Sequence, residues 1–211
     1  DCGEFIAVSY TLGVPHPPGS PLFLLLGRIA SMLPISEDIA FRVNILSPLA
    51  SAFSVLFLYF IIVQLVNHWR GKIETNIDAL IAFGAGVVGS LTFAFTDSHW
   101  FNAVEAEVYA FSTFFTAIVV WLALIWSEKA DEQGNERYIL IIAYMIGLAT
   151  GLHLLNLLTI PFVALLIYFR KFKFEWTSFG ILVALTGLVF FIIHNVIIKG
   201  MPKIADAIGV V

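Results

Sequence analysis

The residues best suited to acid–base chemistry lie in two short polar segments of an otherwise apolar chain. In the first segment, Asp1 and Glu4 are followed by an HPPG string that begins at His16. A carboxylate at the mouth of an apolar cavity can have its pKa raised toward the working pH, and it can then accept a proton from an attacking hydroxyl. Asp1 and Glu4 are therefore candidate catalytic residues.

The same residues also have a structural interpretation. Asp1 as an N-cap and Glu4 three residues later predict a capping box for a helix over residues 4–12. Pro17 or Pro18 of the HPPG string then begins the next helix, at 20–34. The two interpretations are compatible, because a capping carboxylate can also face a cavity.

The second polar segment contains His99, Glu105 and Glu107, with Asp97 at its start. Its aromatic neighbours are typical of an interfacial belt, and its acids could simply be solvated. Glu107, however, opens an apolar run, and a carboxylate near hydrocarbon is unfavourable unless it faces a polar cavity. We therefore expect Glu107 to face inward, toward the first segment.

One further histidine, His153, ends another apolar run together with Asn156. A lone histidine in a membrane helix is more often a hydrogen-bonded packing residue than a ligand, so His153 is the weaker candidate for a substrate contact. No Cys or His stands at metal-ligand spacing from Cys2, the single cysteine. The sequence predicts no metal site or other cofactor, although converging carboxylates leave room for a divalent cation.

The elements that must position these residues are membrane helices. The chain is 60% hydrophobic and 12% charged, against about 25% charged residues in a soluble domain. This composition indicates an integral membrane protein in a lipid bilayer. A net charge of −4, without a basic cluster, excludes nucleic acid as a partner.

Run length predicts about six spans, since a helix that crosses about 30 Å of hydrocarbon needs about 20 residues. The predicted spans are 44–67, 78–97, 108–127, 138–155, 157–169 and 178–198. The apolar stretch 21–34 is shorter and contains Arg28, which favours an interfacial helix. The prediction is an all-α polytopic bundle: a single membrane domain over 1–211, with an external loop at 1–43 and the transmembrane bundle at 44–198.

The basic residues predict the orientation of these spans. Seven of the eleven lie in the first, third and fifth connections between spans, which places those connections in the cytoplasm: Arg70, Lys72, Lys129, Arg137, Arg170, Lys171 and Lys173. Both polar segments then face the opposite side. Because residue 1 is not a methionine and the chain stops soon after an apolar run, we expect the sequence to be a piece of a longer protein.

The order of these motifs resembles the GT-C membrane glycosyltransferases. An acidic D-x-G-E string is followed by HPPG, an amphipathic stretch, the SEDIAFR approach to a span (36–42) and an acidic external connection. The chain is most similar to the bacterial relatives of the protein O-mannosyltransferases, grouped as glycosyltransferase family 117. The resemblance implies a bundle of GT-C type in a bacterial inner membrane, with its active site on the periplasmic face.

The resemblance also implies an inverting enzyme. Its donor is a sugar on a polyprenyl phosphate, and its acceptor is a hydroxyl of a protein Ser/Thr or of a glycan. Carried over to this sequence, Asp1 is the general base, Glu4 is its partner, and His16 neighbours the donor phosphate. The remaining candidates for binding donor or acceptor are Arg42, His99, Glu105, Glu107 and His153. Family members usually have a span before this first loop.

Two other classes of protein remain open. A carboxylate-coupled transporter would also carry acids in a helical membrane body, but its coupling acids lie near the midplane at broken helices. Here the acids stand in loops and at span ends, which favours the enzyme. A non-catalytic membrane subunit that retains the fold is the third alternative, and a transfer assay with a polyprenyl-phosphate sugar distinguishes it from the enzyme.

Overall fold

The computed structural model describes residues 1–17 and 19–209, and every regular element in these ranges is a helix. The all-α class is thereby confirmed. Pro18, one of the two prolines expected to begin a helix, lies outside the described residues. The chain forms two compact units, Asp1–Asn156 and Leu157–Val211, which are described separately.

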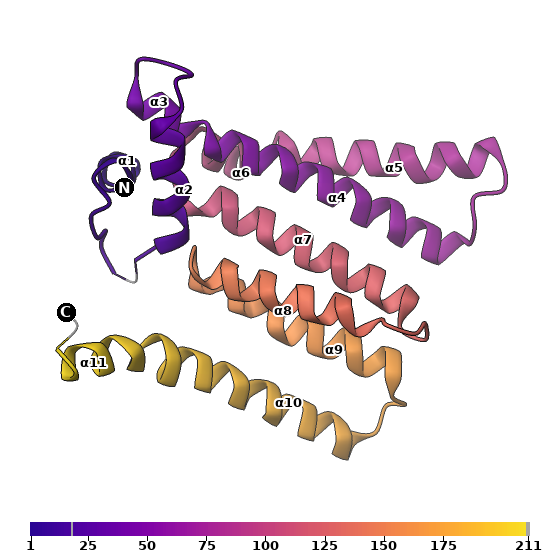
Figure 1. Ribbon diagram of the computed structural model, residues 1–211. Helices are drawn as coiled ribbons and strands as arrows, with labels where there is room; N and C mark the ends of the chain where they lie inside the picture. Colours follow the sequence, from indigo (N-terminus) through magenta and orange to yellow (C-terminus); the bar gives the residue numbers. More distant parts are fainter. Residues whose placement is uncertain (18, 210–211) are drawn as a thin grey trace. The chain divides into compact units, whose positions relative to one another are not determined.

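Four long helices build the body of the first unit (Figure 1). They are α4 (Leu46–Arg70), α5 (Asn76–Ala94), α7 (Val108–Lys129) and α8 (Glu136–Thr150). Helix α4 packs against both α5 and α7, and α7 packs against α8. At about 1.5 Å per residue, α4, α5 and α7 are long enough to cross a bilayer.

Small residues bring α5 close to α4. Ala82, Gly86 and Ser90 are buried and recur every four residues, so they form one stripe along α5. A Cβ atom added at Gly86 would lie 2.7 Å from a methyl carbon of Val63 and 2.8 Å from the ring of Tyr59. Membrane helices associate through such small residues because close backbone approach increases van der Waals contact.

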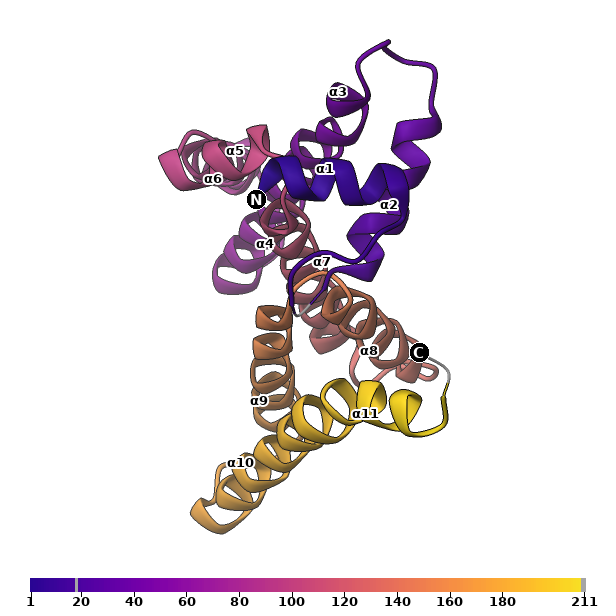
Figure 2. The same cartoon turned by 90° about the vertical axis from the view of Figure 1, so that its left-hand side faces the viewer.

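Short helices cover one end of this body (Figures 1 and 2). These are α1 (Cys2–Thr11), α2 (Pro21–Met32), α3 (Ile39–Asn44) and α6 (Asp97–Val104). Phe23 of α2 is fully buried between Phe5 of α1 and Phe111 of α7, with ring centroids 5.2 and 5.9 Å away. Helix α2 has 12 residues, too few to span, and it runs across the end of the long helices (Figure 1).

Five helical stretches in the described ranges are long and apolar enough to cross a membrane: Ile39–Arg70, Asn76–Ala94, Val108–Lys129, Leu154–Lys171 and Trp176–Ile198. The span expected at 138–155 is not found as one long helix, because α8 has only 15 residues and ends at Thr150. The side chain of Asn156 donates to the carbonyl of Ala149, and the backbone N–H of His153 does the same. The backbone N–H groups of Gly151 and Leu152 donate to carbonyls only three residues back, so the last turn of α8 tightens, and Leu154–Leu158 continue as a 3-10 helix.

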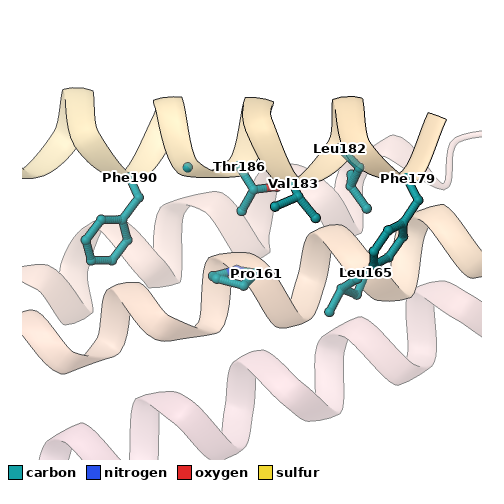
Figure 3. A pocket seen from close by; sticks show the side chains of 8 residues that line it. Pro161, Leu165, Phe179, Leu182, Val183, Thr186 and Phe190 are labelled. Carbon is teal, nitrogen blue, oxygen red and sulfur yellow. The ribbon is translucent and has the colours of Figure 1, made fainter. Parts of the chain in front are cut away.

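The second unit contains α9 (Thr159–Lys171), α10 (Trp176–Phe191), a π-helix (Ile192–Ile198) and α11 (Gly200–Ala207). At the turn between α9 and α10, the hydroxyl groups of Tyr168 and Ser178 lie 2.7 Å apart. A groove of about 360 Å³ between α9 and α10 is lined by Pro161, Leu165 and mostly apolar side chains of α10 (Figure 3). This unit contains none of the candidate catalytic residues.

Candidate functional site

Four of the predicted residues meet at the covered end of the first unit. Asp1 precedes α1, Glu4 is in its first turn, His16 is in the loop after it, and Glu107 precedes α7. The ring of His16 lies between two carboxylates: its Nδ1 is 2.8 Å from Glu4 Oε2, and its Nε2 is 4.0 Å from Asp1 Oδ2. The backbone nitrogen of Asp1 lies 3.3 Å from Glu107 Oε1. We call these four residues the polar cluster.

Glu4 holds the loop that carries His16. One of its carboxylate oxygens accepts the backbone N–H of His16 at 2.8 Å, and the other lies 2.8 Å from Nδ1 of the same residue. These hydrogen bonds lower the pKa of Glu4, because they stabilise its ionised form. An ionised acceptor fixes a proton on Nδ1 of His16, and the ring then presents Nε2 toward Asp1.

The expected capping box is not formed. Asp1 is the N-cap of α1 but makes no side-chain capping bond, and both carboxylate oxygens of Glu4 are engaged by His16. A capping box needs the Glu4 side chain to turn back to the backbone N–H of Asp1. The loop residue His16 outcompetes this local contact, since it offers Glu4 two donors. The carboxylate of Asp1 remains 66% exposed.

Glu107 approaches the first segment, as its position ahead of an apolar run predicts. It is only 8% exposed and stands at the N-cap of α7, where a negative charge complements the helix dipole. The adjoining loop is tied to α1, because the backbone N–H of Ala106 donates to Cys2 Sγ at 3.2 Å. Glu105 is partly buried beside it, and its carbonyl accepts the N–H of Glu107 at 2.8 Å.

The segment after His16 is fastened to the end of α8. The hydroxyl of Ser20 donates to the carbonyl of Leu152 at 3.0 Å, and the N–H of Leu22 donates to Gly151 at 3.1 Å. Sequence reasoning did not find Ser20 or the Cys2 contact. A serine directly before a proline at the first helical position signals a helix start. Nothing in the sequence, however, indicates which distant carbonyl the serine reaches.

His153 lies at the same end of the unit. Its ring centroid is 5.3 Å from that of Tyr109, which is the second residue of α7. Burial lowers the pKa of His153, because a charged imidazole loses hydration there. Its carbonyl accepts from the side chain of Asn156, which is 2% exposed and also accepts from Ser112 of α7 at 3.3 Å. His153 is therefore held against the start of α7 by the contacts of the segment that follows α8.

Of the four predicted residues outside the polar cluster, Glu105 and His153 lie beside the start of α7, whereas Arg42 and His99 make other contacts. Arg42 donates to the carbonyls of Ser31 and Ser36, so its guanidinium closes the connection between α2 and α3. His99 is 6% exposed and packs 4.3 Å from the ring of Phe93. Burial lowers the pKa of His99. The structure thus gives both residues packing or loop-closing contacts.

Within residues 1–17 and 19–209, no three His, Cys, Asp or Glu side chains gather in an arrangement that could hold a metal ion. The polar cluster instead combines an exposed carboxylate, a carboxylate-oriented imidazole and a buried carboxylate. Asp1 of the polar cluster can accept a proton, and His16 can donate hydrogen bonds when its ring is protonated.

The fold and the site define an integral membrane protein with an acidic cluster at one end of a helical bundle. The family described as the protein O-mannosyl-transferase TMEM260 N-terminal domain matches residues 1–176, and the chain belongs to this family. The resemblance to O-mannosyltransferases is confirmed at this level. The narrower assignment to glycosyltransferase family 117 stays a prediction.

Two curated relatives carry similar names. The protein O-mannosyl-transferase tmem260 of Dictyostelium discoideum is 29% identical over 206 residues, which cover 90% of this chain and 23% of that protein. The protein O-mannosyl-transferase TMEM260 of Mus musculus is 27% identical over 186 residues, which cover 88% of this chain and 24% of that protein. The chain therefore spans about a quarter of the length of these eukaryotic relatives. No solved structure shows a significant match.

Proposed function

We propose that the protein contributes the catalytic end of a glycosyltransferase that moves a sugar from a polyprenyl-phosphate donor to a hydroxyl of a protein acceptor or a glycan. The two relatives with similar sequences are named protein O-mannosyl-transferases, which supports a mannosyl donor and a protein acceptor. The observation that carries the proposal is the polar cluster. It brings an exposed carboxylate beside an oriented imidazole at one end of a membrane bundle.

In the proposed reaction Asp1 is the general base. Its carboxylate is exposed and lies 4.0 Å from His16 Nε2, so it is accessible to an acceptor hydroxyl. As the hydroxyl oxygen bonds to the anomeric carbon, its proton passes to Asp1. The bond between that carbon and the phosphate oxygen breaks with inversion, and the polyprenyl phosphate leaves. A phosphate is already a good leaving group, so no covalent enzyme intermediate is required.

Glu4 is a positioning residue in this proposal, because its contacts are made to His16 rather than to the space beside Asp1. A protonated His16 then donates to the donor phosphate and stabilises the charge that develops on it. Glu105, Glu107 and His153 are the proposed contacts to sugar hydroxyls, since all three lie at the start of α7 or against it. Arg42 and His99 are given no substrate contact in this proposal, because their observed contacts are made elsewhere.

The proposed site faces the non-cytoplasmic side of the membrane. This orientation rests on the basic residues of the alternate connections, which are retained in cytoplasmic loops. A periplasmic site in a bacterial inner membrane follows from the sequence resemblance alone, since both named relatives are eukaryotic. Cysteine-accessibility labelling at Arg70 and Glu105 tests the orientation, and modification of both positions from one side would contradict it.

The activity is tested with the purified full-length protein and radiolabelled polyprenyl-phosphate mannose. Transfer of label to a Ser/Thr-containing acceptor supports the enzyme, and the same preparation is examined for proton-coupled sugar uptake in proteoliposomes. Uptake without transfer would replace the enzyme by a transporter. Neither transfer nor uptake, in a folded preparation that receives several polyprenyl-phosphate sugars, would indicate a non-catalytic subunit.

A further inference from the structure

A second candidate site lies in the first unit, where the beginning of α4 meets the end of α5 and the helix α6. A cavity of about 280 Å³ opens there. Its lining is mostly apolar, with Ala52 and Val55 of α4, Ala94 of α5 and Ala103 of α6 among its residues. An apolar cavity with a few polar groups is the usual form of a small-molecule site.

Ser51 is the first polar group in this lining. It is 4% exposed, and its Oγ has no hydrogen-bond partner in the described part of the chain. Ser54, one turn further along α4, is also buried, but its Oγ donates to the carbonyl of Ala50 at 2.9 Å. A buried hydroxyl without a partner is destabilising, because it has lost its hydration and gained nothing. The Ser51 hydroxyl therefore has the capacity to bind a polar atom of a ligand.

His99 is the second polar group. One nitrogen of its buried ring interacts with the backbone of Ser51, and burial lowers the pKa of the ring. A neutral imidazole that donates from one nitrogen has an acceptor lone pair on the other. Ser51 and His99 together thus offer a hydroxyl that can donate and an imidazole nitrogen that can accept. A ligand hydroxyl satisfies both, since it is itself acceptor and donor.

We propose that this cavity binds the hydroxyl end of an uncharged long-chain lipid alcohol. The hydroxyl hydrogen is donated to His99, and the hydroxyl oxygen accepts from Ser51 Oγ. The carbon chain follows the apolar lining formed by Ala52, Val55 and Ala94. The burial of the apolar chain favours binding, while the two hydrogen bonds select the hydroxyl.

Charged lipids and water fit this lining less well. No Lys or Arg lines the cavity, and a neutral imidazole supplies no positive charge for a phosphate or a carboxylate. Liquid water occupies about 30 Å³ per molecule, and each buried water needs two to four polar partners. Among the lining residues only Ser51, His99 and Trp100 carry polar side-chain atoms, so the several waters that about 280 Å³ could hold would find few partners on the protein. The site is also separate from the polar cluster, so this proposal does not rest on the proposed glycosyltransferase activity.

The test uses the full-length protein in nanodiscs and a dodecanol probe with a diazirine in its carbon chain. Photo-crosslinking and peptide mapping should place the label on the segments 48–55 and 94–104, with competition by unlabelled dodecanol. Probes based on dodecanoic acid and methyl dodecanoate should label these segments less. Loss of one hydrogen bond in Ser51→Ala should weaken dodecanol competition by about three- to tenfold.

Ser54→Ala is the matched control, because its hydroxyl already has a partner and does not line the cavity. It should leave labelling unchanged. Ala103→Phe should abolish labelling by filling the cavity. If the acid probe labels as strongly as the alcohol, or if Ser51→Ala and Ser54→Ala behave alike, the proposal is overturned. If the wild type were labelled no more strongly than Ala103→Phe, the cavity would not bind a lipid alcohol, and the proposal would likewise be overturned.

Discussion

The two polar segments contain the same kinds of residue, and the structure uses them differently. In residues 1–16, Glu4 and Asp1 flank the ring of His16, and the carboxylate of Asp1 stays exposed. In residues 97–105, His99 turns into an apolar cavity between α4 and α6, while Asp97 remains on the surface. An imidazole with carboxylates around it can take part in proton transfer. A buried imidazole without them is kept neutral and serves packing or neutral hydrogen bonding.

Beside the general base itself, the largest effect that separates the two segments is expected at His16. In His16→Phe the ring keeps its edge contact with Phe5, at a centroid distance of 5.8 Å, but both nitrogens are lost. Transfer by the full-length protein should fall about 10²-fold, because a donor to the leaving phosphate is removed. His68→Phe, in the last turn of α4, is the control and should transfer at the wild-type rate. Equal rates for the two variants would remove His16 from the site.

A second prediction concerns the scaffold that both segments share. In Gly86→Leu the new side chain meets Val63 and Tyr59 of α4, and the overpacking should destabilise the bundle by about 1–3 kcal/mol. Gly84→Leu, with nothing within 4 Å of the added Cβ, is the matched control. Thermal unfolding in nanodiscs measures both variants. A stable Gly86→Leu protein would show that α4 and α5 are not held together by this close approach.

The smallest effect concerns the pH dependence of the loop that Glu4 holds. The pKa of Glu4 is lowered in the folded protein, so its stabilising contacts with His16 are present above the ordinary carboxyl pKa and are lost as the pH falls through the lowered value. Glu4→Gln should therefore lower the melting temperature slightly near neutral pH, and the difference from the wild type should vanish in acid. A difference that grows on acidification would contradict the assignment.

Much of the fold follows from run length and composition, because the bilayer demands long apolar helices. The all-α bundle, the helices near 44–67, 78–97 and 108–127 and the short helix at α2 all agree with the sequence. The early end of α8 does not follow from hydropathy. There the backbone N–H groups of Gly151 and Leu152 donate only three residues back, and the side chain of Asn156 reaches back to the carbonyl of Ala149. Hydropathy treats Asn156 as a polar interruption and does not show where the helix before it ends.

Contacts of the candidate site could be predicted where charge near hydrocarbon restricts the choices, and they were missed where the folding of a loop decides them. Glu107 stands ahead of an apolar run, so an inward orientation was the favourable one. For Glu4 the local capping interaction was the expectation, whereas a loop residue twelve positions away provides its partners. Arg42 is a cation in an external loop, which suggests a phosphate ligand. Only the folded connection shows that carbonyls of Ser31 and Ser36 engage it.

The measurement that tests the central claim most directly compares Asp1→Asn with Asp97→Asn. Both changes remove one exposed carboxylate from the same end of the bundle and keep the side-chain volume. With full-length protein and a polyprenyl-phosphate donor that the wild type uses, Asp1→Asn should lower transfer by about 10²-fold or more, because the proton acceptor is lost. Asp97→Asn should transfer as the wild type does. Wild-type transfer in Asp1→Asn, or an equal loss in both variants, would contradict the assignment of Asp1 as the general base.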